Sequence, residues 1–445
     1  MGDIDTTWGR YDSAEWQTAQ YFIIIRMKYP NVVKYDVSDF FFGRGLLNTK
    51  IIAAVIVIVL VIAGVGVYFL LKDTDKEINI ISGVNTDGSG IYIKESINKN
   101  DMFDFSTPVP TPKPSGWEGK VFGTPGISTI QHVQLLQIVE GMGMNFAAYV
   151  LGENNNAPNT VYFISSISNA VLALGNTIID GGSLWQPQYQ KIVDDESNKF
   201  KELVLTNDLF PGHACCVIAG YHGYTSSHAD ETVRFLAAYI TAVDWVNAAL
   251  SDDTSADYQK LIEVAKNVTG GTFTDDIIEE ALSTVVYTYG ENSGTPLAYL
   301  FDQIPSLAEN LVEVGATSKT LQDLGFKNGE EFADKFVDDS FLIKALELLD
   351  SGNTYSGSMT NLKVAVITGD IHQIAMHIAA AHLYKDADGK DLPSFFEEFG
   401  LNVSFSGAVN GPGVATAIQN GDASFGLLGA PPITITVING ELVKA

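Results

Sequence analysis

AVNGPGVATAIQNGDASFGLLGAPP, residues 408–432, is the stretch that decides the fold, because it joins a glycine turn, a short helix and a short strand. The Gly-Pro-Gly turn at 411–413 precedes an expected helix over 414–419, and an Asn-Gly-Asp sequence then leads into an apolar strand over 423–428. Glycines at a helix start let backbone N–H groups approach a ligand, and the helix dipole favours an anion there. Taken alone, the segment fits an ordinary α/β turn equally well.

The same order of elements occurs a second time. ISNAVLALGNTIIDGGSLWQPQ, residues 167–188, predicts a helix over 168–174 and a strand over 178–185 that ends at a proline. Both stretches follow a strand, a glycine turn and a helix, expected at 120–122, 123–126 and 129–140 in one copy and at 363–367, 368–370 and 371–384 in the other. Ser128 is the expected N-cap of the helix over 129–140. Two such units predict two lobes with a cleft, and ligands bind at the carboxyl ends of the strands.

Composition restricts the partners. The chain has 445 residues and a formal charge of −27, so its surface repels phosphate backbones and nucleic acid is not an expected partner. Its length suits two lobes or domains rather than one compact core. Cys215 and Cys216 are adjacent, so they cannot connect distant parts of the fold, and they are expected to be buried strand residues.

An uncharged apolar run at 51–71 is long enough to cross a membrane, spanning about 31 Å as a helix. Lys50 and Lys72 flank it. Basic residues precede the run and acidic residues follow it, which places the N-terminus inside and the rest outside. We therefore expect a membrane anchor over 47–72, preceded at 1–46 by a cytoplasmic tail or by a mis-assigned translation start.

Sequence motifs for catalysis are absent. The chain has no GxxxxGK[ST], no GxGxxG with a ribose acid and no GxSxG, and His213 has no further ligand at zinc spacing. His377 and His382 are expected to be packing or surface residues, whereas His372 begins a helix from which it could reach the cleft. The sequence therefore predicts a protein that is not an enzyme and has no cofactor and no metal site.

Several stretches together resemble one family. Besides the two stretches above, these are GKVFGTPGISTIQHVQLLQ at 119–137, LFPGHACCVIAGYH at 209–222 and ETVRFLAAYITAVDWVN at 231–247. They resemble the solute-binding proteins of ABC importers of the nitrate/sulfonate/taurine and thiamine-precursor class, over nearly all of residues 77–445. The resemblance implies an α/β, two-lobed periplasmic-binding-protein-like (type II) fold with a ligand cleft between the lobes. It also implies a small-molecule solute and ABC permease and ATPase subunits as partners.

The order of the segments differs from the order in that family. The unit over 362–437, last in this chain, is the one that comes first there, so the chain looks circularly permuted, with the polar linker 351–361 joining the family's usual termini. The expected lobes are 73–102, 209–350 and 362–445 for lobe 1 and 103–208 for lobe 2. A mis-joined gene and a segment-swapped dimer are the alternatives.

The resemblance and the glycine turns together imply a set of ligand-binding residues: Thr368, Gly369, Asp370, His372, Gly411, Gly413, Asn85, Thr86, Thr124, Gly126, Ser128 and Trp185. The alternative for Trp185 is that it is a core residue. The alternative for Asn85 and Thr86 is that they form a hinge and do not contact the ligand. Asp370 would repel an anion unless its charge is paired, so a zwitterionic or cationic solute also fits the sequence.

The expected function is that of a membrane-anchored, extracytoplasmic solute-binding protein of an ABC importer. The expected solute is small and anionic or zwitterionic, such as a sulfonate, taurine or nitrate. The alternatives are a membrane-tethered sensor or scaffold with the same fold, and a protein that binds a thiamine precursor (a pyrimidine).

Overall fold

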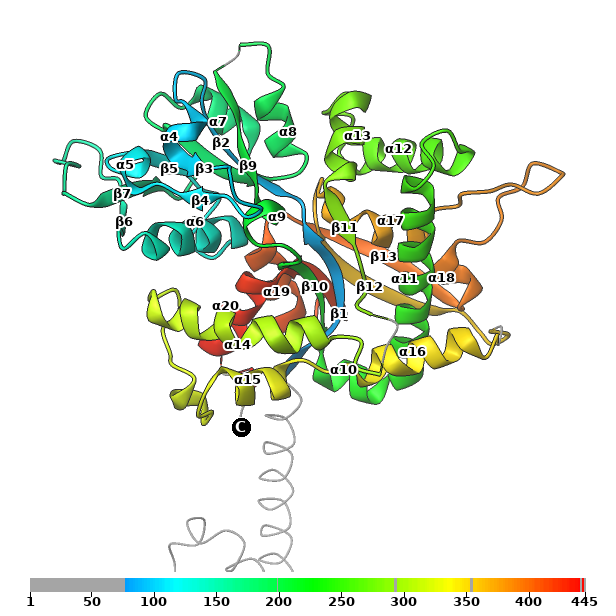
Figure 1. The fold of residues 1–445 in the computed structure, drawn as a ribbon. Helices are drawn as coiled ribbons and strands as arrows, with labels where there is room; N and C mark the ends of the chain where they lie inside the picture. Colours follow the sequence, from blue (N-terminus) through cyan, green and yellow to red (C-terminus); the bar gives the residue numbers. More distant parts are fainter. Residues whose placement is uncertain (1–76, 198, 292–293, 353–354, 441, 444–445) are drawn as a thin grey trace, which may run out of the picture. The chain divides into compact units, whose positions relative to one another are not determined.

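The computed structural model describes residues 77–197, 199–291, 294–352, 355–440 and 442–443. The expected tail at 1–46 and the expected anchor at 47–72 lie outside the described residues. The described residues belong to the compact unit Leu71–Ala445. Their architecture is mixed α/β, with two six-stranded mixed sheets and a small two-stranded one (Figure 1). The predicted α/β class is confirmed at this level.

The first sheet has a block of parallel strands that continues into antiparallel ones. Its order is β11-β1-β10-β14-β12-β13. Strand β12 is parallel to both β13 and β14, whereas β10 is antiparallel to β14 and to β1. In the order of the sheet, the strands are β11 (Val285–Tyr287), β1 (Ile78–Asp87), β10 (Ala214–Tyr221), β14 (Phe425–Gly429), β12 (Thr360–Ile367) and β13 (Leu401–Ala408).

The second sheet also continues from parallel into antiparallel strands, but it has four parallel strands where the first sheet has three. Its order is β6-β7-β5-β8-β2-β9, in which β6, β7, β5 and β8 are parallel and β2 is antiparallel to both β8 and β9. The strands are β6 (Asn145–Ala148), β7 (Thr160–Ile164), β5 (Val121–Gly123), β8 (Gly181–Trp185), β2 (Ser89–Lys94) and β9 (Phe200–Leu205). The short strands β3 (Phe103–Asp104) and β4 (Thr111–Pro112) pair with each other.

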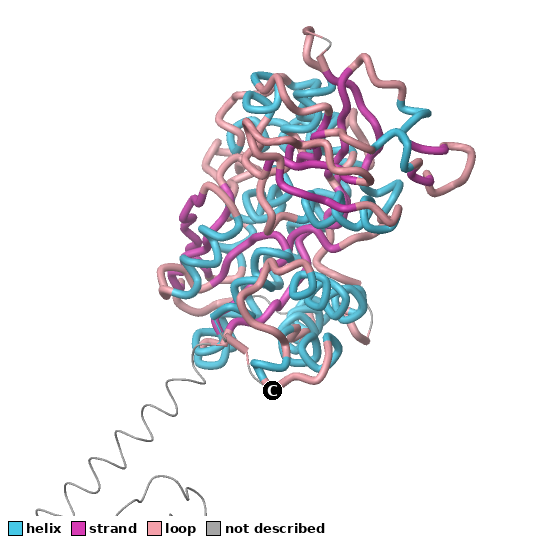
Figure 2. Tube along the Cα trace, turned by 90° about the vertical axis from the view of Figure 1, so that its left-hand side faces the viewer, coloured by secondary structure: helices cyan, strands magenta, loops and turns pink. Residues whose placement is uncertain are grey.

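Helices between the strands cover the sheets. Those between β2 and β10 are α4 (Lys99–Met102), α5 (Pro114–Trp117), α6 (Ile130–Gly141), α7 (Ala170–Gly175), α8 (Gln188–Val193) and α9 (Thr206–Leu209). Those that follow β10 are α10 (His222–Ser227), α11 (Ala229–Leu250), α12 (Ala256–Val268), α13 (Asp275–Ser283), α14 (Ala298–Glu313), η1 (Gln322–Leu324), α15 (Gly329–Phe336), α16 (Ser340–Asp350), η2 (Ile371–Gln373), α17 (Ile374–Ala380), α18 (Phe395–Glu398), α19 (Gly411–Gln419) and α20 (Ala430–Gly440). Figure 2 shows the strand segments flanked by helices and loops.

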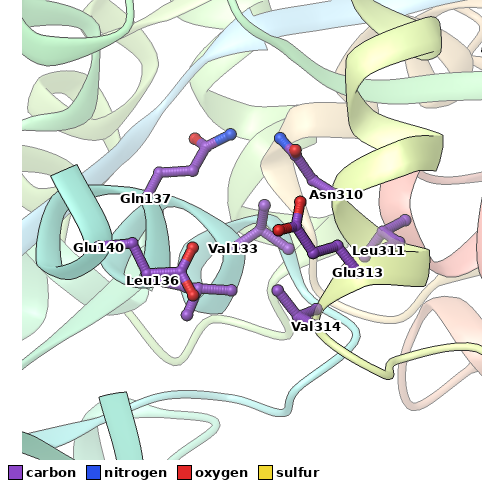
Figure 3. A pocket seen from close by; sticks show the side chains of 8 residues that line it. All are labelled: Val133, Leu136, Gln137, Glu140, Asn310, Leu311, Glu313 and Val314. Atoms are coloured by element: carbon purple, nitrogen blue, oxygen red, sulfur yellow. The ribbon is translucent and has the colours of Figure 1, made fainter. Parts of the chain in front are cut away.

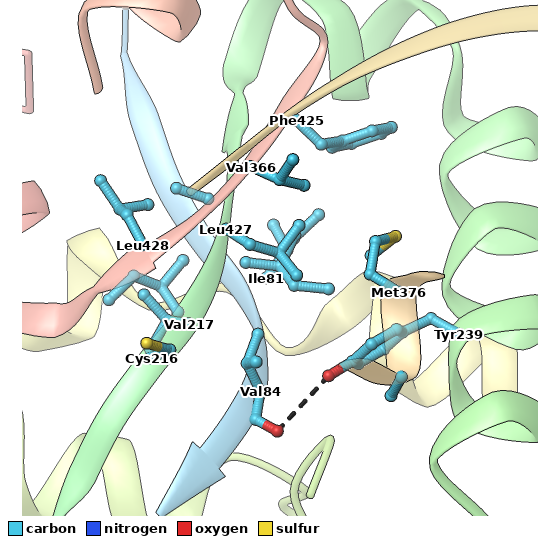
Figure 4. Packing of buried hydrophobic residues seen from close by; sticks show 14 of the residues in the cluster. Ile81, Val84, Cys216, Val217, Tyr239, Val366, Met376, Phe425, Leu427 and Leu428 are labelled. Carbon is cyan, nitrogen blue, oxygen red and sulfur yellow. Dashed lines mark hydrogen bonds between the residues drawn. The ribbon is translucent and has the colours of Figure 1, made fainter. Parts of the chain in front are cut away.

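Each sheet has buried cores of its own. Helix α11 is apolar and long enough to cross a membrane, but most of its length is buried in the core of the first sheet, where the ring of Phe235 stacks on Phe425 at 4.3 Å. The hydroxyl of Tyr239 donates to the carbonyl of Val84 in the same core (Figure 4). The second sheet has one cluster around Phe122 and another around Tyr189. Removing these apolar side chains from water is the main stabilising term of the fold.

Several element boundaries differ from those expected. The N-cap of α6 is Thr129 rather than Ser128, because the Thr129 side chain accepts from the N–H of His132. The expected helix over 371–384 begins with a 3₁₀ turn and ends at Ala380. The expected proline exit at 431–432 is instead the first turn of α20, where proline is tolerated because its missing N–H would have no partner there.

The chain passes between the two sheets at residues 85–90, whose sequence NTDGSG has the composition of a turn. Strand β1 ends at Asp87 and β2 begins at Ser89, so the sequence NTDGSG does not reverse the chain. Asp87 and Gly88 have positive φ angles of 64° and 84°, which redirect the strand. Residues 89–94 therefore pair with β8 and β9 within the second sheet, and the expected lobe bounds stay a prediction.

Candidate functional site

Two crossing segments, residues 85–89 and 206–213, carry the chain between the sheets and contact each other. The N–H of Asp87 donates to the carbonyl of His213 at 3.3 Å, and the hydroxyl of Thr206 donates to the carbonyl of Ser89 at 2.9 Å. His213 Nδ1 also lies 3.1 Å from Asp87 Oδ1, close enough for ion pairing, although Asp87 Oδ1 has no aligned hydrogen bond among the described residues. Burial lowers the pKa of His213, but Asp87 and the other neighbours outweigh it and raise the pKa overall.

Asn85 and Thr86 are buried inside the first crossing segment. The Asn85 amide donates to the carbonyls of Thr86 and Asp87 at 3.4 and 3.2 Å, and the Thr86 hydroxyl donates to Asp87 Oδ2 at 3.2 Å. Asn85 Oδ1 has no hydrogen-bond partner among the described residues. These contacts lie within the crossing segment, and both the expected ligand contact and the alternative hinge role of the two residues stay predictions.

Asp370 and His372 form a buried ion pair after β12. His372 Nδ1 lies 2.8 Å from Asp370 Oδ1 and Nε2 lies 2.9 Å from the carbonyl oxygen of Gly88. Both ring nitrogens face acceptors, so both must carry a proton and the ring is an imidazolium. Burial lowers the pKa of His372, but Asp370 and Cys215 outweigh it and raise the pKa to about 9. The charge of Asp370 is therefore paired, and this loop presents no bare carboxylate to an anion.

The other predicted residues of the first sheet share one edge. Ile367 and Ala408 are in register at the ends of the parallel strands β12 and β13, and the N–H of Thr368 donates to the carbonyl of Ala408 at 2.9 Å. This pairing brings Thr368 and Gly369 to the same sheet edge as the glycine turn at 411–413.

One of the expected free donors in that turn is already used. The N–H of Gly413 donates to Asn410 Oδ1 at 3.1 Å, because Asn410 is the N-cap of α19. Sequence reasoning missed this cap, although an Asn before an apolar helix signals one. Packing explains why residue 411 is a glycine, because a Cβ at this position would lie 2.7 Å from Pro432 Cγ.

The predicted residues after β5 are also largely engaged. The Thr124 hydroxyl lies 3.1 Å from His132 Nδ1, and the carbonyl of Gly126 accepts from the hydroxyl of Thr129 at 2.8 Å. Burial lowers the pKa of His132 to about 4, so its ring is neutral near pH 7. Ser128 is half-buried and is not the cap. Among the described residues, no hydrogen bond joins this turn to the turn at 411–413.

Trp185 and Gln186 end strand β8 beside the first crossing segment. Trp185 is half-buried and in register with Ser89. Gln186, which the predicted set omits, is fully buried; its N–H donates to the carbonyl of Gly88 and its side-chain amide donates to the hydroxyl of Thr284, each at 3.0 Å. Since Thr284 directly precedes β11, Gln186 links the two sheets.

Cys215 and Cys216 are buried in β10, as expected. A register shift at this point, where Asn85 pairs with Cys216 and Thr86 with Ala214, leaves Cys215 as the extra residue of a bulge, and the two sulfur atoms lie 3.9 Å apart. The pKa of the Cys215 thiol is lowered to about 6. The hydrogen bond with Cys216 is the main cause and the charge of His372 adds to it, whereas burial acts in the opposite direction. The pKa of Cys216 is raised by its bond to Cys215 and by burial.

Four exposed apolar side chains follow parallel strands in the chain. Ile127 follows β5, Leu151 follows β6 and Val171 follows β7, whereas Val409 follows β13 of the first sheet; they are 50%, 79%, 78% and 91% exposed.

A cavity of about 170 Å³ lies between α6 and α14, away from the glycine turns (Figure 3). Its floor is apolar and includes Val133, Leu136 and Leu311, while Glu140 and Glu313 stand at its rim. Figure 3 shows the amides of Gln137 and Asn310 pointing toward each other across it. The two carboxylates make this cavity unsuited to an anion.

No protein family and no curated protein matches the chain. A solved structure that aligns with it is the ligand-binding component of an ABC-type import system from Staphylococcus aureus, with zinc bound. The alignment covers 60% of this chain and 74% of that one, at 14% sequence identity and a TM-score of 0.35. A likeness this distant carries no argument about the fold or the ligand of this chain.

Proposed function

We propose that the chain is the extracytoplasmic solute-binding protein of an ABC importer and has the type II fold. The observation that carries the proposal is the pair of mixed sheets, each with a block of parallel strands that continues into antiparallel ones, joined by two crossing segments that contact each other. Two such bodies on a short hinge can close around a small molecule. The protein works by binding and release rather than catalysis, and it passes its solute to a permease driven by an ATPase.

The membrane anchor belongs to the same proposal. The apolar run at 51–71 holds the protein on the outer face of the cell membrane, with the N-terminus inside. A protein held there samples only the volume next to its permease, which raises its effective concentration.

Circular permutation explains the order of the elements. The parallel strands β12, β13 and β14 of the first sheet come last in the chain, and the N–H of Ile78 at the start of β1 donates to the carbonyl of Leu442 at 3.0 Å. The C-terminal residues therefore return to the point where the described chain begins. A direct connection there, with new ends within 351–361, would restore the family's order.

The proposed solute is small, anionic or zwitterionic, and carries an apolar part. The pairing of Asp370 with His372 removes a repulsive charge from the loop after β12, and helix α19 directs its N-terminus to the same edge. The exposed Val409 and Val171 supply apolar contact. Sulfonates and taurine combine these features.

A thermal-shift screen of the full chain in detergent tests the proposal. Sulfonates, taurine, nitrate and a thiamine-precursor pyrimidine are added at millimolar concentration, with sodium sulfate as the ionic-strength control. A ligand present at about 100 times its Kd stabilises the fold by about 2.7 kcal/mol. If no solute raises the melting temperature above the control, the importer function is wrong and a tethered scaffold takes its place.

A further inference from the structure

The two cysteines of the chain are neighbours in space as well as in sequence. In a regular strand, successive side chains point to opposite faces of the sheet, which keeps their ends apart. Cys215 and Cys216 depart from this rule, because their sulfur atoms lie 3.9 Å apart. The cause is the bulge in β10, where β1 pairs with Ala214 and with Cys216 and leaves Cys215 without a partner residue. The fold therefore holds two thiols together at one place.

This place lies at the junction of the two sheets. Strand β10 begins where the second crossing segment ends, and Cys216 pairs with Asn85 of the first crossing segment on one side and with Gly429 on the other. Pro211 and Gly212, which come just before the strand, are exposed, and the two cysteines keep 3% and 5% of their surface exposed. The pair therefore lies close to the surface at the end of a strand, where local opening costs least.

The two sulfur atoms differ in charge. The hydrogen bond with Cys216 lowers the pKa of Cys215 most, whereas burial raises it. The charges of His372 and His213 lower the pKa further, to about 6. At pH 7 Cys215 is therefore mainly a thiolate, while the raised pKa of Cys216 keeps that residue a thiol. In a thiolate beside a thiol, one sulfur can attack an oxidant and the other can then displace the oxygen from the product.

We propose that Cys215 and Cys216 are a reversible oxidation site, which a hydroperoxide converts into a disulfide between the two neighbours. The Cys215 thiolate attacks the terminal peroxide oxygen, the O–O bond breaks, and the leaving alkoxide or hydroxide takes up a proton, so that Cys215 becomes a sulfenic acid. Cys216 then attacks this sulfur, the S–S bond forms, and hydroxide leaves and takes the Cys216 proton as water. The two thiols together lose two electrons, and the peroxide is reduced to an alcohol or to water.

The resulting disulfide is expected to be easily reduced. Neighbouring Cα atoms are about 3.8 Å apart, which is less than the roughly 4.4 to 6.8 Å across an ordinary disulfide. Strain of this kind makes a disulfide more oxidising, which is typical of labile rather than structural bonds. Oxidation also removes the negative charge that His372 faces, at the strand that follows the second crossing segment. The site thus links the redox state of the protein to the junction of the sheets, and it does not depend on the proposed function.

Thiol counting on the full chain in detergent tests the proposal, because the chain has only 2 cysteines. After treatment with millimolar hydrogen peroxide, we expect both thiols to disappear and the intact mass to fall by that of two hydrogen atoms. Dithiothreitol should then restore both thiols. The proposal is overturned if the folded protein keeps both thiols under conditions that oxidise the urea-unfolded chain. A disulfide between two molecules, seen as a doubled mass without reductant, also overturns it.

Matched variants separate the roles of the two sulfur atoms. Cys216→Ser should stop at the sulfenic acid, so its mass rises by that of one oxygen atom and dimedone, which traps sulfenic acids, labels Cys215. Cys215→Ser should react with peroxide about tenfold more slowly at pH 7, because burial still raises the pKa of the remaining thiol. Each variant replaces one thiol of the same bulge by a hydroxyl, so each controls for a change of folding in the other. Equal rates in the two variants contradict the proposal.

Discussion

His372 Nε2 lies 2.9 Å from the carbonyl oxygen of Gly88, so a loop of the first sheet holds the residue at which the chain enters the second sheet. The other ring nitrogen is bonded to Asp370. The ring donates to Asp370 and to Gly88 at the same time only while it carries both protons, which makes this junction dependent on pH.

The contribution of His372 to the stability of the fold should fall as the pH rises above neutrality, while the lowered pKa of Cys215 makes a contribution of the opposite sign. Because the pKa of His372 is raised to about 9 from an ordinary 6.5, its contribution is complete below pH 6.5 and is lost as the pH passes through 9. The contribution is on the order of 3 kcal/mol. Urea unfolding from pH 6 to 10 measures it, and His372→Gln should flatten the profile. A parallel decline in wild type and variant would show that other groups cause the loss.

A pair of glycine substitutions separates backbone strain from crowding. Gly88 and Gly152 have φ angles of 84° and 87°, but a Cβ on Gly88 would lie 2.4 Å from His372 Nε2, whereas a Cβ on Gly152 meets open space. We expect Gly152→Ala to cost about 1 kcal/mol of unfolding free energy. Gly88→Ala should cost at least twice as much. Equal losses would mean that His372 does not occupy the space beside Gly88.

The bond between Gln186 and Thr284 should couple the two sheets energetically. Gln186→Ala and Thr284→Val each remove one partner of the 3.0 Å hydrogen bond. In a double-mutant cycle of unfolding free energies we expect a coupling of about 1 kcal/mol. If the losses of unfolding free energy in the two single variants simply add up in the double variant, the two side chains are not in contact in solution.

Replacing the N-cap of α19 should weaken the helix that carries the glycine turn. Asn410→Ala removes the acceptor for the N–H of Gly413 and should cost about 1 kcal/mol of stability. Asn410→Ser retains a side-chain acceptor and serves as the control. The measurement is the urea midpoint of both variants.

A rearranged chain tests the permutation. Residues 362–445 followed directly by 77–350 should fold with the circular dichroism spectrum and monomeric mass of residues 77–445 in their present order, since Leu442 already bonds to Ile78. A rearranged chain that aggregates, while the domain in its present order is monomeric, would argue against a permuted ancestry.

The sequence predicts elements whose signals are local. The strand expected over 363–367 is β12, Thr360–Ile367, and the helix expected over 129–140 is α6, Ile130–Gly141. Apolar runs bounded by glycine and polar caps are sufficient for such elements. The Gly-Pro-Gly sequence at 411–413, which was expected to be a turn before the helix, is instead the first turn of α19, because Asn410 caps the helix one residue earlier.

The features that the sequence does not predict depend on distant partners. Residues 85–90 have the composition of a turn, and only pairing with Cys216 on one side and Trp185 on the other makes them a crossing between sheets. The acceptor of His372 is 284 residues away in the chain. The closeness of Cys215 and Cys216 comes from a bulge in pairing with β1, which no spacing within β10 reveals.

The two crossing segments also determine how the sheets can move. The two segments are the covalent connections between the sheets, and hydrogen bonds at Asp87–His213 and Ser89–Thr206 join them to each other. If the two sheets move against each other as the proposed function requires, links bonded in this way favour rotation about one axis over sliding. Opening would then retrace the path of closing, and a ligand would leave by the route along which it entered.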